Sequence, residues 1–202
     1  MDTNSLALPA GNFKAYLFDM DGTIADTMPL HFVSWTQAVE EAGGTFPEDL
    51  FYAWGGVPLI GVVENLNRHF GYKLDPAAVA HRKEDLYLSM LDQVTPVAAV
   101  LEHVHAQYGK IPFAIVSGSP RDSIRRTLTT LNLLRYFPVI VGAEDYKQGK
   151  PNPEPFLTAA ARLNVEPVDC LVFEDADAGI RAAEAAGMQW IHVPSYRPTL
   201  HS

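Results

Sequence analysis

Four short apolar runs constrain the fold of this 202-residue chain more than any other feature of its sequence. Each run is hydrophobic throughout and does not alternate with polar residues, which is typical of parallel strands buried on both faces. A fifth run of the same kind follows near the C-terminal end. Because segments with helical spacing separate the later runs, the pattern predicts an α/β fold, a doubly wound parallel sheet. The predicted strands are 15–18, 112–116, 139–141, 170–173 and 190–193.

One long stretch interrupts this alternation of strands and helices. Between about 27 and 92 no segment has the features of a strand, and three helices are predicted there, at 28–42, 57–70 and 76–90. We therefore predict a helical insertion after the first strand, with a helical domain at 27–92 and an α/β core made of 1–26 and 93–202. The helices predicted for the core are 96–108, 119–133, 152–163 and 177–187.

Polar side chains follow the predicted strands at the point where each strand ends. The first strand leads into DMDGT at 19–23, the second into SGS at 117–119, and the fourth into Glu174-Asp175. A short loop after the third strand leads to Lys150. Because ligands bind at the carboxyl ends of strands in open α/β sheets, we expect these side chains to converge on one edge of the sheet.

The predicted cluster has a definite chemistry. Asp19, Glu174 and Asp175 bring three carboxylates together, and unpaired carboxylates raise one another's pKa. A hard divalent cation relieves this repulsion, and Mg²⁺ prefers oxygen ligands. The chain has a formal charge of −9, so a site for an anionic substrate must supply its own positive charge. Mg²⁺ and Lys150 would supply it, and Ser117 would hold a further phosphoryl oxygen.

Asp19 and Asp21 are two residues apart, so in an extended segment their side chains face the same way. One can attack a substrate while the other handles protons. Taken alone, each motif also has a simpler interpretation: a solvated turn for DMDGT, a loop for SGS, a solvated side chain for Lys150, and a helix cap for Glu174-Asp175. Their common position at strand ends favours one shared site.

Composition excludes several other classes of protein. The acidic excess is unlike that of a nucleic-acid binder. The single cysteine, Cys170, excludes an intramolecular disulfide and a multi-cysteine zinc site, and its apolar surroundings predict a buried side chain. No run reaches the roughly 18 apolar residues that span a bilayer, and the N-terminal residues lack the pattern of a signal peptide. We therefore expect a cytoplasmic protein that binds neither nucleic acid nor a membrane.

The ordered motifs resemble those of a known family. DMDGT (19–23), SGS (117–119), KP (150–151) and FEDADAGIRAAEAAGM (173–188) together are similar to the haloacid dehalogenase-like (HAD) hydrolase superfamily, over about 14–193. The resemblance implies a HAD-like Rossmannoid core, and the helical insertion resembles a C1-type cap. Within the superfamily the chain is most similar to the β-phosphoglucomutase-like branch, in particular to its fructose-1-phosphate phosphatase-like members.

The resemblance implies a role for each matching residue. Asp19 would be the nucleophile that forms an aspartyl-phosphate. Asp21 would be the general acid for the leaving alcohol and then the general base for water. Thr23 would orient the loop. The implied metal ligands are Asp19, Asp175, the backbone carbonyl of Asp21, and Glu174 either directly or through water. The residues implied to bind the phosphoryl group are Ser117, Gly118 and Lys150.

The segment at 53–59 determines how far the resemblance to the mutases extends. In those enzymes a lysine and an arginine of the cap bind the distal phosphate of a bisphosphate, and an ungapped alignment puts Gly55 and Leu59 at their positions. Without these cations a distal phosphate loses its partners, which favours a monophosphate substrate. Trp54 either stacks on a sugar or belongs to the core of the cap.

Two further positions of the helical insertion have alternative interpretations. His31 matches a histidine of the cap that faces the site in this branch, or it is an exposed polar residue of the first helix of the insertion. Arg82 and Lys83 either face the cleft or lie on a solvated helix face.

These observations predict a monomeric Mg²⁺-dependent phosphatase that hydrolyses a small sugar phosphate, a fructose-1-phosphate-like monophosphate, through an aspartyl-phosphate. One alternative is a β-phosphoglucomutase-type phosphomutase. Another is a non-catalytic regulator that binds a phosphorylated metabolite, although such a protein has no need of Asp21. A two-component receiver domain also forms a phospho-aspartate, but it has no use for Asp21 as a proton donor or for the insertion.

Overall fold

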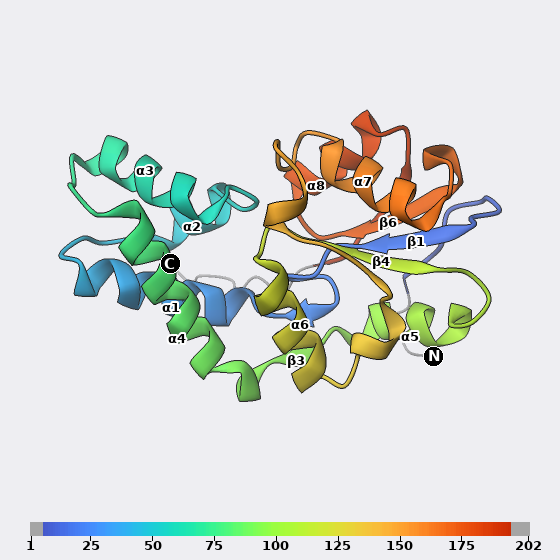
Figure 1. Cartoon of the computed structure of the whole chain (residues 1–202), viewed down its shortest axis with the longest axis horizontal. Coiled ribbons are helices and arrows are strands. Elements are labelled where there is room, and N and C mark those ends of the chain that lie inside the picture. The colour runs from blue at the N-terminus through green and yellow to red at the C-terminus, as the bar shows by residue number, and fades with distance from the viewer. Residues whose placement is uncertain (1–5, 195–202) are drawn as a thin grey trace.

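Five parallel strands form the central sheet of the computed structural model, in the order β5-β4-β1-β6-β7 (Figure 1). The structure describes residues 6–194. All five predicted strands are confirmed, each with ends within one residue of the prediction. The strands are β1 (Ala15–Phe18), β4 (Phe113–Val116), β5 (Val139–Val141), β6 (Cys170–Glu174) and β7 (Gln189–His192).

Helices cover both faces of the sheet, so the predicted doubly wound α/β fold is confirmed. Helices α5 (Ala98–Gln107) and α6 (Arg121–Thr130) pack on one face, and α7 (Glu154–Leu163) and α8 (Asp177–Ala185) pack on the other (Figure 1). The side chains of β1 alternate between the two resulting cores. The aromatic pair Tyr16 and Phe18 enters the first core, and Ala15 and Leu17 enter the second.

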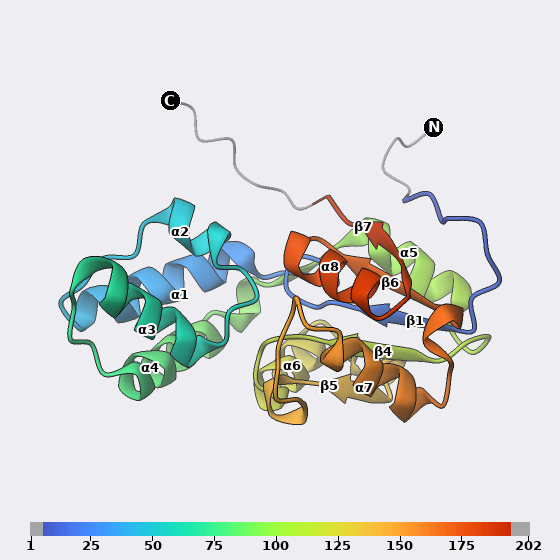
Figure 2. The ribbon, with the colours of Figure 1, turned by 90° about the horizontal axis from the view of Figure 1, so that it is seen from above.

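The helical insertion lies beside the sheet as a separate group of helices (Figure 2). It consists of α1 (Met28–Glu41), α2 (Glu48–Ala53), α3 (Leu59–Phe70) and α4 (Pro76–Ser89). These helices share a hydrophobic core of their own, to which Trp35, Phe46, Phe51 and Leu66 belong. The prediction that 27–92 contains helices and no strand agrees with this arrangement.

The two connections to the insertion run side by side. Strand β2 (Ala25–Asp26) leaves the core and β3 (Thr95–Pro96) returns to it, and the two pair in antiparallel fashion. A further bond from Val97 N to Ile24 O, 3.0 Å long, extends this ribbon. The insertion therefore joins the core through two short, paired strands.

The remaining differences from the predicted helices have local causes. Helix α3 begins at Leu59 because Pro58 adopts an extended backbone, with ψ of 147°, and stands as the N-cap. Pro120 does the same before α6, with ψ of 142°, and Asn132 ends that segment with a left-handed φ of 58°. Helix α2 was not predicted because its six residues are too few to show a hydrophobic period. Within 6–194 the structure also has four 3₁₀ turns: Leu91–Gln93, Leu134–Tyr136, Ala143–Asp145 and Pro167–Asp169.

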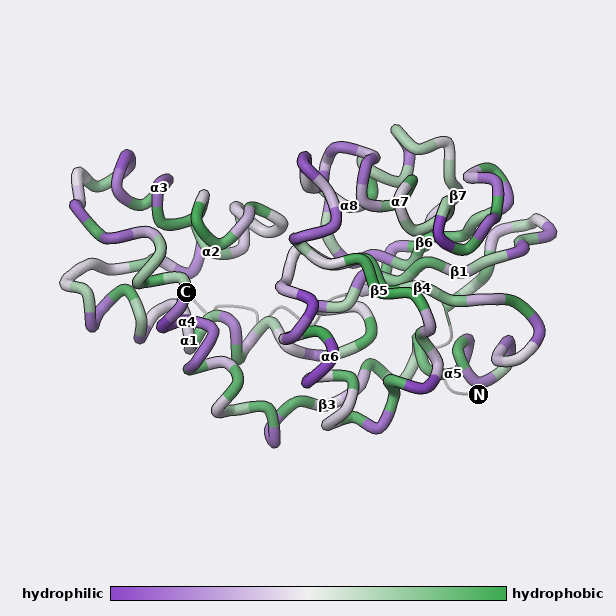
Figure 3. Tube along the Cα trace, in the orientation of Figure 1, coloured by the Kyte–Doolittle hydropathy of each residue, from purple (hydrophilic) through white to green (hydrophobic). Residues whose placement is uncertain are grey.

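Hydropathy along the chain follows this architecture, with the most hydrophobic segments in the central strands and the hydrophilic ones on outward-facing helices (Figure 3). No helix within 6–194 is long and apolar enough to cross a membrane. The ends of the predicted α/β core, 1–5 and 195–202, lie outside the described residues.

Candidate active site

The register of the sheet brings the predicted motifs together. Asp19 directly follows β1, and its backbone N–H donates to Phe173 O of β6 at 2.9 Å, so Asp19 and Glu174 end adjacent strands. Ser117 follows β4 on the other side of β1, and its N–H donates to Val141 O of β5 at 3.0 Å. The carboxyl ends of four strands therefore meet at one edge, as the sequence predicts.

Lys150 connects the carboxylates of this edge. Its Nζ lies 2.6 Å from Asp19 Oδ1 and 2.6 Å from Glu174 Oε1, and it donates to Val116 O at 3.0 Å. The Lys150 side chain is only 8% exposed. Although burial alone would lower the pKa of Lys150, the charges of Asp19 and Glu174 raise it above its usual value. The ammonium group is therefore a fixed positive charge at the centre of the site.

Three carboxylates gather beside Lys150. Oxygen atoms of Asp19, Glu174 and Asp175 all lie within 4.8 Å of one another. Burial raises the pKa of Asp19 well above its usual range, although the Lys150 charge opposes this shift. Burial and then the charge of Glu174 raise the pKa of Asp175 to about 7. An all-oxygen, electrostatically repulsive donor set of this kind fits Mg²⁺.

Two glycines allow the acidic groups to approach so closely. A side chain at Gly179 would overlap with the Glu174 carboxyl group, so α8 can pack against Glu174 only because it carries glycine there. Gly22 has a φ of 94°, and a side chain at this position would overlap with Asp175. Thr23 Oγ1 donates to Asp175 Oδ1 at 3.4 Å.

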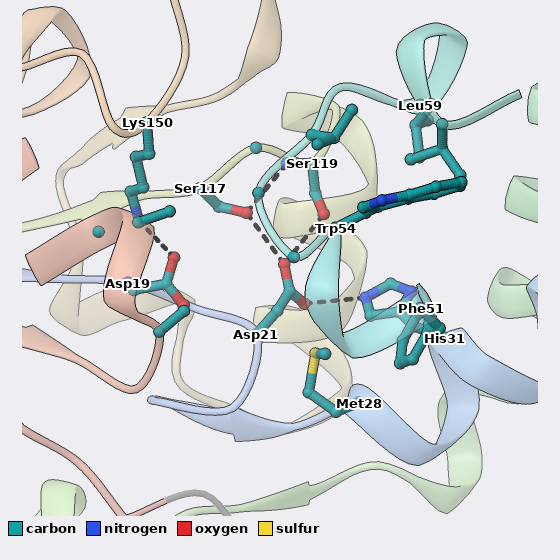
Figure 4. A pocket seen from close by; sticks show the side chains of 18 of the residues that line it. Asp19, Asp21, Met28, His31, Phe51, Trp54, Leu59, Ser117, Ser119 and Lys150 are labelled. Atoms are coloured by element: carbon teal, nitrogen blue, oxygen red, sulfur yellow. Dashed lines mark hydrogen bonds and ion pairs between the residues drawn. The ribbon is translucent and has the colours of Figure 1, made fainter. Parts of the chain in front are cut away.

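Asp21 is held by four donors that come from two sides, of which Figure 4 shows His31, Ser117 and Ser119. Thr27 Oγ1 lies 2.8 Å and His31 Nε2 3.0 Å from Oδ1, both from the start of the insertion. Ser117 Oγ and Ser119 Oγ each donate to Oδ2 at 3.0 Å from the core. Burial alone would raise the pKa of Asp21, but His31 and these hydroxyl donors hold it well below its usual range. Asp21 is therefore a carboxylate in this arrangement.

His31 faces the site, so the interpretation of an exposed residue is wrong for it. Its Nδ1 lies 2.9 Å from the Nζ of Lys83, a side chain that is only 2% exposed and also donates to Glu84 Oε1 at 2.7 Å. Lys83 therefore faces the inside of the molecule. The solvated face is occupied by its neighbour Arg82, which is exposed and pairs with Glu41.

A cavity joins these groups to the helical insertion. Trp54, Gly55 and Leu59 line it, as does Gly118, beside the three carboxylates, Lys150 and His31. Trp54 lines the cavity and also packs on Phe46 in the core of the insertion, with ring centroids 5.7 Å apart, and its stacking on a sugar stays a prediction.

A family model described as haloacid dehalogenase-like hydrolase matches residues 16–193, which is most of the chain. The chain belongs to this family. The predicted resemblance is thus confirmed for the fold, and the HAD assignment makes the edge of the sheet described above its candidate active site.

Several HAD relatives are phosphatases or mutases. Fructose-1-phosphate phosphatase YqaB from Escherichia coli (strain K12) is 37% identical over 182 residues, which are 90% of this chain and 96% of that protein. Phosphorylated carbohydrates phosphatase from Thermotoga maritima is 33% identical over 183 residues, covering 89% of this chain and 84% of that protein. The crystal structure of β-phosphoglucomutase from Clostridium difficile superimposes with a TM-score of 0.80 at 26% identity, covering 88% and 83% of the two chains. The chain is therefore a HAD-family phosphoric monoester hydrolase.

Two contacts of this HAD site were not predicted from the sequence. The hydrogen bond from Ser119 to Asp21 was not predicted, although Ser119 belongs to the SGS motif. Its spacing of two residues from Ser117 is the signal that both hydroxyls point the same way. Tyr146 also lines the cavity and donates to Ser117 O at 3.2 Å, and nothing in its sequence context indicates this.

Proposed function

We propose that the protein is a Mg²⁺-dependent phosphatase that hydrolyses a small sugar monophosphate, similar to fructose 1-phosphate, through an aspartyl-phosphate. The observation that carries the proposal is the pair of aspartates at the end of β1. Asp19 lies against the fixed charge of Lys150, and Asp21 points to the hydroxyl and imidazole donors. One carboxylate thus sits where a phosphoryl group can be bound, and the other is organised to exchange a proton.

In the first half-reaction a carboxylate oxygen of Asp19 forms a bond to phosphorus while the bond from phosphorus to the sugar oxygen breaks. Asp21 gives its proton to that oxygen, so the sugar leaves as a neutral alcohol. Lys150 and Ser117 bind the other phosphoryl oxygens and stabilise the charge that develops on them. In the second half-reaction Asp21 takes a proton from water, the water oxygen attacks phosphorus, and inorganic phosphate leaves Asp19.

The hydrogen bonds of Asp21 are consistent with its role as the base of the second half-reaction. The four donors around it keep the group ionised, which is the form that a base requires, although they also oppose its protonation. To act first as an acid it has to be protonated, and this becomes easier when one donor is withdrawn. Ser117 is the donor expected to turn away, because its hydroxyl is also the one that would bind the phosphoryl group.

Asp19, Glu174 and Asp175, with the backbone carbonyl of Asp21, would hold Mg²⁺, which supplies positive charge for the phosphoryl oxygens when it is bound. We further propose that 27–92 acts as a cap, hinged at 24–28 and 91–96, that closes over the substrate and excludes water. The paired strands at these two connections support this role. A monomer suffices for this reaction, because one chain supplies every group of the site. We also propose a cytoplasmic location, because phosphorylated metabolites of this kind are expected there.

The test is the variant Asp19→Asn, assayed with Mg²⁺ on a panel of sugar phosphates. We expect turnover to fall by about 10³-fold or more. Asp49→Asn, at an exposed aspartate of α2, is the control and should retain full activity. Release of inorganic phosphate distinguishes a phosphatase from a phosphomutase, which would instead shift the phosphate within the sugar. Full activity of Asp19→Asn would exclude the mechanism, and wild-type protein inactive on the whole panel would favour the non-catalytic regulator.

A further inference from the structure

The cavity has two chemically different ends. One is the polar edge of the sheet, with Asp19, Asp21 and Lys150. The other, here called the apolar wall, comes from the insertion. In Figure 4, Phe51, Trp54 and Leu59 gather on the side of the cavity that faces away from Asp19 and Lys150. The apolar wall consists of Trp35, Phe46, Phe51, Trp54, Leu59 and Val62.

The apolar wall is an extension of the core of the insertion. All six side chains belong to or pack against one hydrophobic cluster, and their rings contact each other. Phe46 packs on Trp35, Phe51 and Trp54 with centroid distances of 5.9, 6.0 and 5.7 Å. The wall is therefore held in place by packing before any substrate binds, and the side chains that line the cavity here are aromatic and aliphatic.

Cations that could bind a second anionic group are missing from this wall. Among the described residues that line the cavity, the insertion contributes a single cation, Lys83. Its Nζ is already shared between His31 Nδ1, at 2.9 Å, and Glu84 Oε1, at 2.7 Å. A carboxylate or a second phosphate placed against the wall would lose its water without gaining a cationic partner.

The same argument applies, less strongly, to hydroxyl groups. The side chains of the wall offer only the indole N–H groups of Trp35 and Trp54 as donors, and no side-chain acceptor. A leaving alcohol with many hydroxyls would therefore exchange water for apolar atoms on this side. A flat, neutral ring would instead bury its faces against aromatic side chains.

We infer that the site takes, in addition to the proposed sugar monophosphates, phosphate monoesters of hydroxymethyl groups attached to neutral, flat, apolar rings. We infer further that it turns these over with a higher kcat/KM than esters of polyhydroxylated or anionic alcohols of similar size, the sugar monophosphates included. This rests on the proposed phosphatase function, which supplies the reaction. The polar edge binds the phosphoryl group of either class, and the apolar wall makes the choice between them.

The inference is tested by comparing benzyl phosphate, glycerol 1-phosphate and 4-carboxybenzyl phosphate, all of which release primary alcohols. With Mg²⁺ present we expect kcat/KM for benzyl phosphate to exceed that of each other ester by about tenfold or more. Binding is measured separately by calorimetry with the non-hydrolysable 2-phenylethylphosphonate and 3,4-dihydroxybutylphosphonate. The phenyl compound should bind about tenfold more tightly.

A matched pair of variants examines the wall itself. Leu59→Asn should reduce the preference for the phenyl phosphonate severalfold, whereas Ile60→Asn should leave it unchanged, since Ile60 is exposed and lies outside the cavity. Both positions are at the start of α3 and neither side chain is fully buried, so the two variants should fold equally well.

The outcomes separate the two proposals. If none of these esters and no member of the sugar phosphate panel is hydrolysed, but the phenyl phosphonate still binds more tightly, the phosphatase proposal fails and the preference of the wall stands. If esters are hydrolysed but the hydroxylated or anionic members are bound and turned over equally well, the phosphatase proposal stands and the inference is wrong. Equal effects of Leu59→Asn and Ile60→Asn would also overturn it.

Discussion

The Nζ of Lys83 lies 2.9 Å from Nδ1 of His31, on the side of the imidazole opposite the bond from Nε2 to Asp21. An ammonium group has only protons to donate, so Nδ1 is the acceptor and the ring proton is on Nε2. Burial and the charge of Lys83 lower the pKa of His31, which keeps the ring neutral. A neutral His31 donates to Asp21, and Lys83 fixes the direction of that hydrogen bond.

Lys83→Met is expected to impair catalysis with little change in the affinity for substrate. Without Lys83, His31 can carry its proton on either nitrogen, and the bond to Asp21 is no longer fixed. We expect kcat on a sugar phosphate to fall about 10–100-fold. Arg82→Met is the matched control, because Arg82 is exposed and pairs only with Glu41 among the described contacts. Equal effects of the two variants, or an effect on KM alone, would contradict this role.

Ser119→Ala should reveal whether Ser119 positions the general acid. Its hydroxyl donates to Asp21 Oδ2 at 3.0 Å, and it should keep this bond when Ser117 turns to the phosphoryl group. We expect kcat to fall about tenfold for a sugar phosphate but little for p-nitrophenyl phosphate, whose leaving group departs without a proton. Ser119→Thr should restore most of the activity. A loss of equal size for both substrates would argue against positioning and for a general structural effect.

The sequence indicates the polar edge of the sheet more fully than the interior of the insertion, and the reason is physical. Asp19, Ser117 and Glu174 follow buried strands, and parallel strands bring their carboxyl ends to one edge whatever the rest of the chain does. The orientation of Lys83 has no such rule. Arg82 and Lys83 are adjacent charged residues of α4, and only the packing of α4 against α1 decides which of them is buried.

The same limit applies to the cavity wall. The sequence at 53–59 indicates missing cations, and Gly55 and Leu59 do line the cavity. Phe46 and Phe51 were not predicted there, because an aromatic residue anywhere in the insertion is equally consistent with a closed core. Whether such a core opens onto a cavity depends on how four helices are arranged in space, which no local pattern records.

Asp175→Asn should stabilise the metal-free protein. The pKa of Asp175 is raised to about 7 in the folded protein, whereas an unfolded aspartate ionises near pH 3.9, at about its ordinary value. Unfolding therefore releases a proton between these values, and the stability contributed by the protonated group is lost as the pH rises from about 4 to 7. In EDTA at pH 7 we expect the free energy of unfolding of the variant to exceed that of the wild type by about 1–3 kcal/mol.

The control for Asp175→Asn is built into the pH series, because the difference should vanish near pH 4, where the wild-type carboxyl is protonated in both states. Addition of Mg²⁺ should raise the Tm of the wild type and have a smaller effect on the variant, because a ligand that binds only the native state stabilises it. A variant that is less stable than the wild type in EDTA at pH 7 would show that Asp175 is not under electrostatic strain.

Leu59→Arg should give the site a binding partner for a second phosphate. Leu59 lines the cavity from the first turn of α3, where the mutases are expected to carry an arginine, and its side chain is only partly buried. A guanidinium group there faces the apolar wall and can form paired hydrogen bonds with a distal phosphate. We expect the Ki of a hexose bisphosphate to decrease about tenfold, with a smaller change for the monophosphate. Ile60→Arg adds the same charge one residue away, outside the cavity, and should change neither constant. If both arginines lower the Ki equally, net charge explains the effect; if neither does, the alignment of 53–59 with the distal-phosphate segment of the mutases is wrong.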